Sequence, residues 1–330
     1  MTDPYQPILE TLAKAKRVLI TTHVRPDGDA LGSTAAMVLG LRNKNIEAEV
    51  LLLSHLPKKY AFVYHDLGIF HHDAEAGWPA TLLLEKFDVL LVIDTGTWSQ
   101  LPGLRERIEG WDVPKLVVDH HLTQENWASH KLVDTQAAAA GEIVAELLKR
   151  WNIPLDVSIA TALFLAIATD TGWFQFSNTR PCTMRLAATL MEAGVNTDKM
   201  YQLLYQNERA ERIALQARAM QSMELLGDNR LAVMMVRKAD FEATRANVPD
   251  TEALINVPLQ IATVEVSILL TEPMEPGPIR VSLRSKGKID VAKFAEQFGG
   301  GGHARAAGLK VAGELPAARD RVVTEMIKML

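Results

Sequence analysis

Short apolar runs rich in β-branched residues alternate with helix-like stretches through the first half of the chain, and this rhythm constrains the fold most. The strand-like runs cover residues 18–22, 46–53, 89–93 and 116–118, and the helical stretches cover about 29–44 and 139–151. Such alternation is typical of βαβ units, in which helices cover both faces of a parallel sheet. It predicts an α/β domain built on a parallel sheet.

The second half of the chain changes its pattern. An almost wholly apolar run at 161–169 predicts a buried helix with Asp170 at its C-terminal end. Helical periodicity follows at 184–193, 198–205 and about 210–226, and strand-like runs at 231–236, 263–270 and 279–284 precede a helix at about 291–297. The expected domains are an N-terminal α/β domain over 1–193, a helical connector over 194–226, and a smaller C-terminal α+β domain over 227–330.

Acidic and histidine side chains stand where the predicted strands end. They are His23, Asp27 and Asp29, then Asp94, then Asp119, His120 and His121, and finally Asp170 after the long apolar run. Open parallel sheets bind ligands beyond the carboxyl ends of their strands. We therefore expect these side chains to gather at one edge of the sheet.

The chemistry of these side chains indicates a pair of divalent cations. Mixed carboxylate and imidazole ligands without thiolate favour Mn²⁺, with Mg²⁺, Co²⁺ or Zn²⁺ as competitors. Four crowded aspartates would repel one another unless two divalent ions balanced their charge. Two such ions about 3.5–4 Å apart can hold a bridging hydroxide that attacks a phosphoryl group in line with the leaving oxygen. Phosphoester hydrolysis is the reaction that this set favours.

Simpler interpretations apply to each cluster by itself. Taken alone, Asp29 precedes a helix and could equally be its N-cap. The adjacent His120 and His121 could be surface imidazoles, as we expect for His71 and His72. The repeated placement of the clusters after strands is what favours a metal site over these alternatives.

Composition limits the compartment and the partners. The single cysteine, Cys182, excludes an internal disulfide framework and suits a reducing compartment, and we expect its side chain to be buried. No membrane span or targeting segment stands out, so a cytoplasmic protein without a membrane partner is expected. A net charge of −5 argues against duplex DNA as a partner, because sequence-blind duplex binding needs many basic contacts. A homodimer is compatible with these observations.

A glycine run marks the second domain. Residues 299–302 are four glycines followed by His303, and Arg284 and Ser285 precede them. Backbone N–H groups without side chains can approach a phosphate closely. The simpler interpretations are a glycine-rich turn and, for 284–288, a solvated basic face. Trp173 and Phe174 could stack on a base, but core packing is favoured.

In order and spacing, these motifs resemble those of the DHH phosphoesterases. The matching residues are His23-x-x-x-Asp27-x-Asp29, Asp94, Asp119-His120-His121 and Thr169-Asp170-Thr171-Gly172. The glycine run with His303, preceded by Arg284 and Ser285, resembles the DHH-associated C-terminal domain. The resemblance spans nearly the whole chain and is closest to the nanoRNase/pAp-phosphatase branch, the NrnA-like proteins.

The resemblance implies a role for each matched residue. It implies one metal held by His23, Asp27 and Asp94, a second held by Asp29, Asp94, His120 and Asp170, and substrate bound by Arg284, Ser285, Gly300, Gly301, Gly302 and His303. Asp119 would orient its neighbours. His121 would face the scissile phosphate, where it would donate a hydrogen bond or protonate the leaving hydroxyl.

The resemblance also implies an activity, with alternatives left open. The preferred function is metal-dependent hydrolysis of short oligoribonucleotides to 5′-mononucleotides and of 3′-phosphoadenosine 5′-phosphate (pAp) to AMP. Its alternatives are a phosphodiesterase of cyclic di-AMP, pApA or pGpG, and a non-catalytic nucleotide sensor, against which the intact ligands count. Gln100 and Gln175 stand where arginine is frequent, and Ala140 where a hydroxyl residue is frequent. These departures affect substrate preference rather than the metal ligands.

Overall fold

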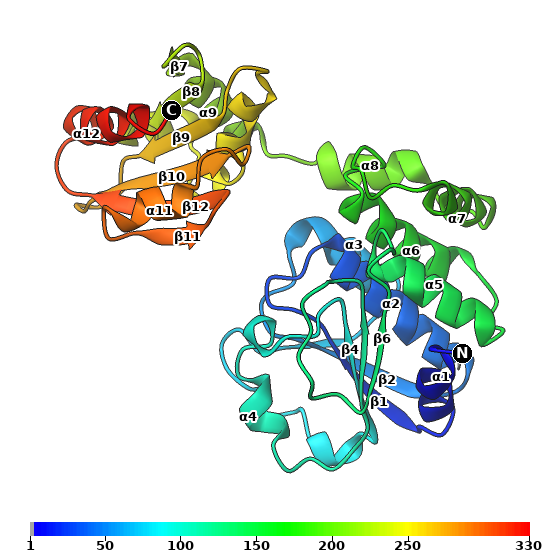
Figure 1. The fold of residues 1–330 in the computed structure, drawn as a ribbon. Helices are drawn as coiled ribbons and strands as arrows, with labels where there is room; N and C mark the ends of the chain where they lie inside the picture. Colours follow the sequence, from blue (N-terminus) through cyan, green and yellow to red (C-terminus); the bar gives the residue numbers. More distant parts are fainter. Residues whose placement is uncertain (1–2) are drawn as a thin grey trace. The chain divides into compact units, whose positions relative to one another are not determined.

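The structure is a computed structural model that describes residues 3–330. The chain divides into two compact units, the first ending at Asn207 and the second spanning Glu208 to Leu330 (Figure 1). The first unit contains α1 (Gln6–Leu12), β1 (Arg17–Thr21), α2 (Gly28–Asn43), β2 (Glu47–Leu52), η1 (Lys58–Tyr60), α3 (Ala61–His65), β3 (His71–Asp73), η2 (Leu84–Lys86), β4 (Val89–Ile93), η3 (Trp98–Gln100), α4 (Leu104–Ile108), β5 (Lys115–Asp119), β6 (His130–Val133), α5 (Ala140–Arg150), α6 (Val157–Asp170), α7 (Pro181–Glu192) and α8 (Thr197–Tyr205).

The first unit is built on a six-stranded sheet in the order β3-β2-β1-β4-β5-β6. Every neighbouring pair in this sheet is parallel. From β1 the chain adds β2 and β3 on one side, and it then returns to add β4, β5 and β6 on the other. The direction of winding therefore reverses between β1 and β4, which is where open parallel sheets form their ligand sites. The predicted parallel α/β sheet is confirmed.

Helices cover both faces of this sheet, as the alternation of buried side chains along the strands requires. Ile20 of β1 packs in the core beneath α1, α2, α5 and α6, whereas its neighbour Leu19 packs on the opposite face with α4. Figure 1 shows α4 on the far side of the sheet from α1 and α2. The predicted buried helix at 161–169 is α6, most of whose residues are buried.

Two glycines bring α2 against α6. An ideal Cβ on Gly28 would lie 2.3 Å from the hydroxyl oxygen of Thr169, and one on Gly32 would lie 2.4 Å from the carbonyl oxygen of Ala162. Only glycine permits so close an approach. Because Asp29 lies in the first turn of α2 and Asp170 ends α6, this contact sets the separation between the two carboxylates.

The second unit contains a second six-stranded sheet, in the order β11-β12-β10-β9-β8-β7. Only the β8–β9 pair is parallel. Its elements are α9 (Ala210–Gln221), β7 (Glu224–Leu226), β8 (Leu231–Val236), α10 (Lys238–Thr244), η4 (Val248–Thr251), η5 (Leu254–Gln260), β9 (Val266–Thr271), β10 (Ile279–Ser285), α11 (Val291–Glu296), β11 (Gly301–His303), β12 (Ala306–Val311) and α12 (Leu315–Ile327). Phe294 of α11 and Val322 of α12 pack in one core of the unit, and Leu215 of α9 and Phe241 of α10 pack in another. The predicted smaller α+β fold is confirmed.

The helix predicted over 210–226 is too long. It ends at Gln221, and residues Glu224–Leu226 form β7 instead. The Ser222 hydroxyl accepts a hydrogen bond from the Met235 N–H and donates one to the Met235 carbonyl, each at 2.8 Å. This pair of bonds turns the chain from the helix into the sheet.

Two expectations about single residues are wrong. Cys182 is exposed, because the buried side of α7 is formed by Thr183, Ala187 and Leu190, and Cys182 lies outside that stripe. His72 is buried rather than at the surface, because it belongs to strand β3 and its Nε2 lies 2.6 Å from an oxygen of Glu49. A three-residue strand of polar residues carries no apolar alternation from which it could be predicted.

No helix among residues 3–330 combines the length and the hydrophobicity that a bilayer crossing requires.

Candidate metal centre

The loop after β1 and the start of α2 supply the first three predicted ligands. The His23 Nδ1 lies 3.0 Å from the carbonyl oxygen of Val24, so Nδ1–H donates and Nε2 is left as an acceptor. Asp27, and not Asp29, is the N-cap of α2, since its carboxylate accepts from the N–H groups of Asp29 and Ala30 at 3.0 and 3.1 Å. The N-cap role that the sequence left open for Asp29 therefore belongs to Asp27.

The carboxylate of Asp29 is fully buried and is held by a distant helix. It accepts from the backbone N–H groups of Ala140 at 2.6 Å and Gly141 at 3.0 Å, and from the Ser33 hydroxyl at 2.9 Å. The two backbone donors begin α5, where the helix dipole also favours a negative charge. Oδ2 of Asp29 lies 3.7 Å from Nε2 of His120, so the same carboxylate also faces the cluster.

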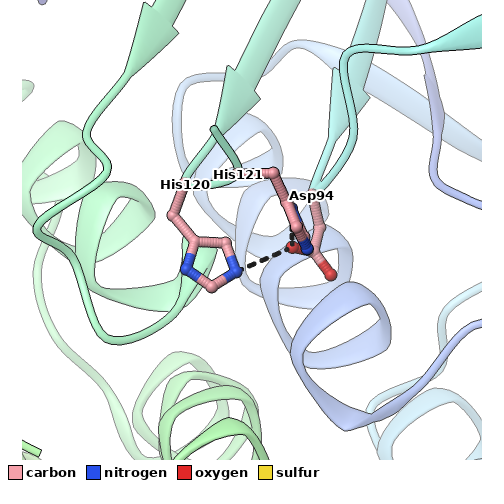
Figure 2. A group of neighbouring side chains, drawn as sticks. All are labelled: Asp94, His120 and His121. Carbon is pink, nitrogen blue, oxygen red and sulfur yellow. Dashed lines mark ion pairs between the residues drawn. The ribbon is translucent and has the colours of Figure 1, made fainter. Parts of the chain in front are cut away.

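Asp94 lies at the centre of the cluster. It follows β4 directly, is 2 % exposed and adopts a left-handed backbone with φ +66°. Its Oδ2 lies 3.4 Å from Nε2 of His23, whereas its Oδ1 lies 3.4 Å from Nε2 of His120 and 3.7 Å from Nδ1 of His121. Figure 2 shows both imidazoles of the His120-His121 pair beside this carboxylate. Oδ1 is buried and makes no hydrogen bond to any of the described residues.

Asp119 ends β5 and organises the two histidines that follow it. One oxygen, Oδ1, accepts from the His120 N–H at 2.8 Å, the His121 N–H at 3.2 Å and the His121 Nδ1–H at 2.8 Å. The other, Oδ2, accepts from the side-chain amide of Gln124 at 2.5 Å. Nδ1 of His120 lies 3.3 Å from the carbonyl oxygen of Ala137, which leaves its Nε2 as the acceptor on the cluster side. Both imidazoles are thus held in one tautomer.

Asp170 completes the cluster from the C-terminal end of α6. Its Oδ2 lies 3.8 Å from Nε2 of His120. The side-chain amide of Asn178 donates to the carbonyl oxygens of Asp170 and Ala138 at 3.2 and 3.0 Å. This amide ties the end of α6 to the segment that precedes α5.

The charges of the cluster shift the pKa values of its members. Burial by itself would lower the pKa of His23, but the neighbouring carboxylates of Asp27 and Asp94 outweigh it and raise the value to about 11, which protonates the imidazole while no metal is bound. Burial would likewise lower the pKa of His120, but the neighbouring aspartates outweigh burial and raise the pKa to about 10. Burial and then the charge of Asp94 raise the pKa of Asp170 to about 6, despite the opposing charge of His120. Without cations, the cluster holds protons that metal ions would displace.

The residues present fit a pair of divalent cations. Three overlapping groups have ligand atoms within 4.8 Å of one another, namely His23 with Asp27 and Asp94, Asp29 with His120 and Asp170, and Asp94 with His120 and His121. Asp94 belongs to two of these groups, and its buried Oδ1 has no hydrogen-bond partner in the part of the chain that the structure describes. A buried carboxylate oxygen without a partner is costly unless a cation compensates it. Acidic and histidine side chains therefore cluster here as a divalent metal site requires.

A cavity of about 640 Å³ opens beside this cluster. The metal-facing side is formed by His23, Asp27, Asp94, His121 and Asp170, and the remaining wall by Thr95, Thr97, Ser99, Gln100, Leu122 and Thr123. The volume falls within the range of small-molecule sites.

The substrate-binding residues predicted in the second domain lie on one part of its sheet. Arg284 and Ser285 end β10, and Arg284 pairs with Ala306 of β12. Gly301, Gly302 and His303 form the exposed edge strand β11 on the other side of β12, and Gly300 directly precedes it. The glycine run is thus partly a strand rather than only a turn.

Three groups around the cluster were not singled out by the sequence. They are the N–H groups that begin α5, the amide of Asn178 and the amide of Gln124. For the N–H groups of α5, the sequence offered one signal, the predicted start of a helix near residue 139. Trp173 and Phe174 pack against Phe164 at ring distances of 5.8 and 5.7 Å, in agreement with the core interpretation.

Comparison with known proteins assigns both halves of the chain to families. Residues 17–167 match the model of the DHH family N-terminal domain, and residues 229–329 match that of the DHHA1 domain. The chain is 28 % identical to the bifunctional oligoribonuclease and PAP phosphatase NrnA of Thermus thermophilus, over 93 % of this chain and 88 % of that one. Identity to the Bacillus subtilis protein of the same name is 24 %, over 92 % of each.

The fold has a close counterpart among solved structures. An exopolyphosphatase-related protein from Bacteroides fragilis superposes with a TM-score of 0.83 and 23 % identity, covering 98 % of this chain and 95 % of that one. The chain therefore shares the fold of that solved structure over nearly its whole length.

Proposed function

The chain belongs to the DHH family of phosphoester hydrolases, and we propose that it hydrolyses short oligoribonucleotides to 5′-mononucleotides and pAp to AMP. The observation that carries this proposal is the central position of Asp94, whose two carboxylate oxygens face His23 on one side and His120 on the other. Likeness over nearly the whole chain to two enzymes named for these two activities supports the choice of substrates.

Two cations, which we propose to be Mn²⁺, would be held by the residues of the cluster. His23, Asp27 and Asp94 would hold one, and Asp29, Asp94, His120 and Asp170 the other. When bound, such a pair activates water and neutralises charge on the phosphoryl oxygens. The protein's part is to fix the imidazole tautomers and to keep Asp94 buried between the two groups.

His121 is the side chain that we propose to meet the phosphate. Its Nδ1–H is bound to Asp119, so its Nε2 is free, and the residue lines the cavity. The hydrogen bond to Asp119 raises the pKa of His121, which favours the protonated imidazole as a donor. In the hydrolysis, water adds its hydroxyl to phosphorus and a proton goes to the leaving oxygen. A protonated His121 can stabilise the phosphoryl oxygens or supply that proton.

The second unit would bind the rest of the substrate. We propose Arg284 and Ser285, with Gly300 to His303, as the binding residues for a substrate phosphate. The guanidinium of Arg284 makes only one hydrogen bond among the described residues, to the carbonyl of Leu283, and forms no ion pair there. Most of its donors therefore stay available for a phosphate.

Steady-state hydrolysis of a matched substrate panel with Mn²⁺ tests the proposal. The panel contains a 5′-phosphorylated RNA dinucleotide and pentanucleotide, pAp, cyclic di-AMP, pApA, pGpG and a long single-stranded DNA. We expect the highest kcat/KM on the short RNAs and pAp. Dominant turnover of cyclic di-AMP or of one linear signalling dinucleotide would refute the substrate assignment. The absence of turnover with Mn²⁺, Mg²⁺ and Co²⁺ would refute hydrolysis altogether.

A further inference from the structure

Gln124 lies at the junction of the two loops that carry Asp94 and the His120-His121 pair. Its side-chain amide donates to Oδ2 of Asp119 at 2.5 Å and to the carbonyl oxygen of His121 at 3.2 Å. Both partners are acceptors, so the orientation of the amide is determined by its neighbours. Among the described residues, this amide is the only hydrogen-bond donor to Oδ2 of the fully buried Asp119.

Gly96, two residues after Asp94, provides the space for this amide. An ideal Cβ on Gly96 would lie 1.9 Å from Oε1 of Gln124 and 2.9 Å from its Nε2. Gly96 has no positive φ, so its backbone suits alanine, and the three atoms nearest to the new Cβ all belong to the Gln124 amide. The amide thus lies directly over the loop that follows β4.

The backbone of Gly96 is itself held in place. Its carbonyl oxygen accepts from the N–H of Glu125 at 3.1 Å and from the indole N–H of Trp127 at 3.0 Å. The carboxylate of Glu125 accepts from the N–H of Trp98 at 3.1 Å, and the rings of Trp98 and Trp127 lie 4.5 Å apart. A side chain at position 96 would therefore displace the Gln124 amide rather than the loop.

We propose that Gln124 is a positioning residue for the hydrolytic reaction, acting through Asp119 on His121, and that Gly96 is glycine in order to admit its amide. The inference rests on the proposed function, because it assigns His121 to the phosphate. Asp119 fixes the ring of His121 through Oδ1, and Gln124 fixes the carboxylate of Asp119 through Oδ2. Without that second hydrogen bond, the Asp119 carboxylate can rotate, and the imidazole of His121 is no longer held in one orientation.

The test is a double-mutant cycle of Gly96→Ala and Gln124→Ala, with Gln221→Ala, at an exposed position of α9, as the control. Each cycle variant is expected to lower kcat on the RNA dinucleotide by about 10- to 100-fold with KM changed by less than about threefold, a range typical of lost outer support at metal sites. The double variant should be no worse than Gln124→Ala, because the alanine side chain then has no amide to displace.

Calorimetric titration with Mn²⁺ gives a readout that does not depend on turnover. We expect Mn²⁺ affinity within about threefold of the parent in all variants, since no proposed ligand atom contacts Gln124. Additive losses in the double variant, or equal losses in kcat and Mn²⁺ affinity, would overturn the positioning role. Failure of the parent protein to hydrolyse any substrate would instead refute the proposed function, so the two failures are distinguishable.

Discussion

The contact between α2 and α6 makes a sharp prediction for Gly32→Ala. The new Cβ would lie 2.4 Å from the carbonyl oxygen of Ala162 and 2.8 Å from the backbone N of Ala166. Ordinary contacts begin near 3.4 Å, so the two helix backbones must separate by about 1 Å. Gly40→Ala is the matched control, because it lies in the same helix and the nearest atoms to its Cβ belong to movable side chains, Cδ2 of Leu148 at 2.4 Å and Cδ1 of Ile153 at 3.3 Å.

The expected magnitudes follow from these contacts. Overpacking costs about 1–3 kcal/mol, and alanine recovers up to about 1 kcal/mol over glycine within a helix. Gly32→Ala should therefore destabilise the first unit by about 1–2 kcal/mol, which lowers Tm by roughly 2–8 °C for a domain of this size. Gly40→Ala should change stability by less than about 1 kcal/mol, because rotation of Leu148 relieves its contact.

The separation of the helices should also weaken metal binding. Asp29 moves with α2 and Asp170 with α6, whereas metal–ligand distances tolerate only about 0.2 Å. Thermal melts with EDTA and with Mn²⁺, together with calorimetric titration of Mn²⁺, measure both effects. We expect an affinity loss of roughly 10-fold or more in Gly32→Ala alone. Equal Mn²⁺ affinity in the two variants would refute the claim that this contact sets the spacing of the ligands.

Further predictions concern the cluster and the second unit. Asp94→Asn should lower kcat by at least about 1,000-fold and abolish binding of one Mn²⁺, as counted by calorimetry; near-normal turnover would contradict a shared ligand. Arg284→Ala should raise KM for the RNA dinucleotide about 10-fold with kcat little changed, whereas the exposed Arg237→Ala should alter neither; a loss confined to kcat would exclude a binding role. The raised pKa values of His23 and His120 stabilise the metal-free folded state against unfolding. This contribution to the free energy of unfolding is complete below about pH 6.5, the pKa in the unfolded chain, and is lost as pH rises toward 10–11. Metal binding displaces the same protons, so the increase in Tm produced by Mn²⁺ should grow between pH 6.5 and 9, and a constant increase would count against these pKa shifts.

The sheet and the cluster could be predicted because both are encoded locally. A β-branched run such as 89–93 has the period and the burial of a central parallel strand, and its last residue is followed at once by Asp94. Parallel strands place their carboxyl ends at the same edge, so separate clusters could be brought together without knowledge of the packing.

The parts that could not be predicted depend on contacts between distant segments. The donors to Asp29 come from Ala140 and Gly141, and Gln124 acts across a loop onto Gly96. Neither contact leaves a periodic pattern in the sequence. The burial of His72 has the same kind of cause, because its partner Glu49 lies on a neighbouring strand. Hydrogen bonds between side chains and remote backbone depend on tertiary packing, which local patterns do not report.

The capping of the Asp29 carboxylate by α5 has a consequence for biosynthesis. Asp29 is separated from its donors Ala140 and Gly141 by 111 and 112 residues. At roughly 5–20 residues per second, a ribosome needs about 6–22 s to synthesise that interval. Until then the carboxylate must stay hydrated, because a buried charge without partners is costly. We therefore expect α2 to dock late, with its first-turn amides gaining protection in pulse-labelled hydrogen exchange during refolding no earlier than those of Ala140 and Gly141. Earlier protection of α2 would show that another group shields the charge. Simultaneous protection would mean that the first unit can complete its folding during synthesis only after the segment with Ala140 and Gly141 has been translated.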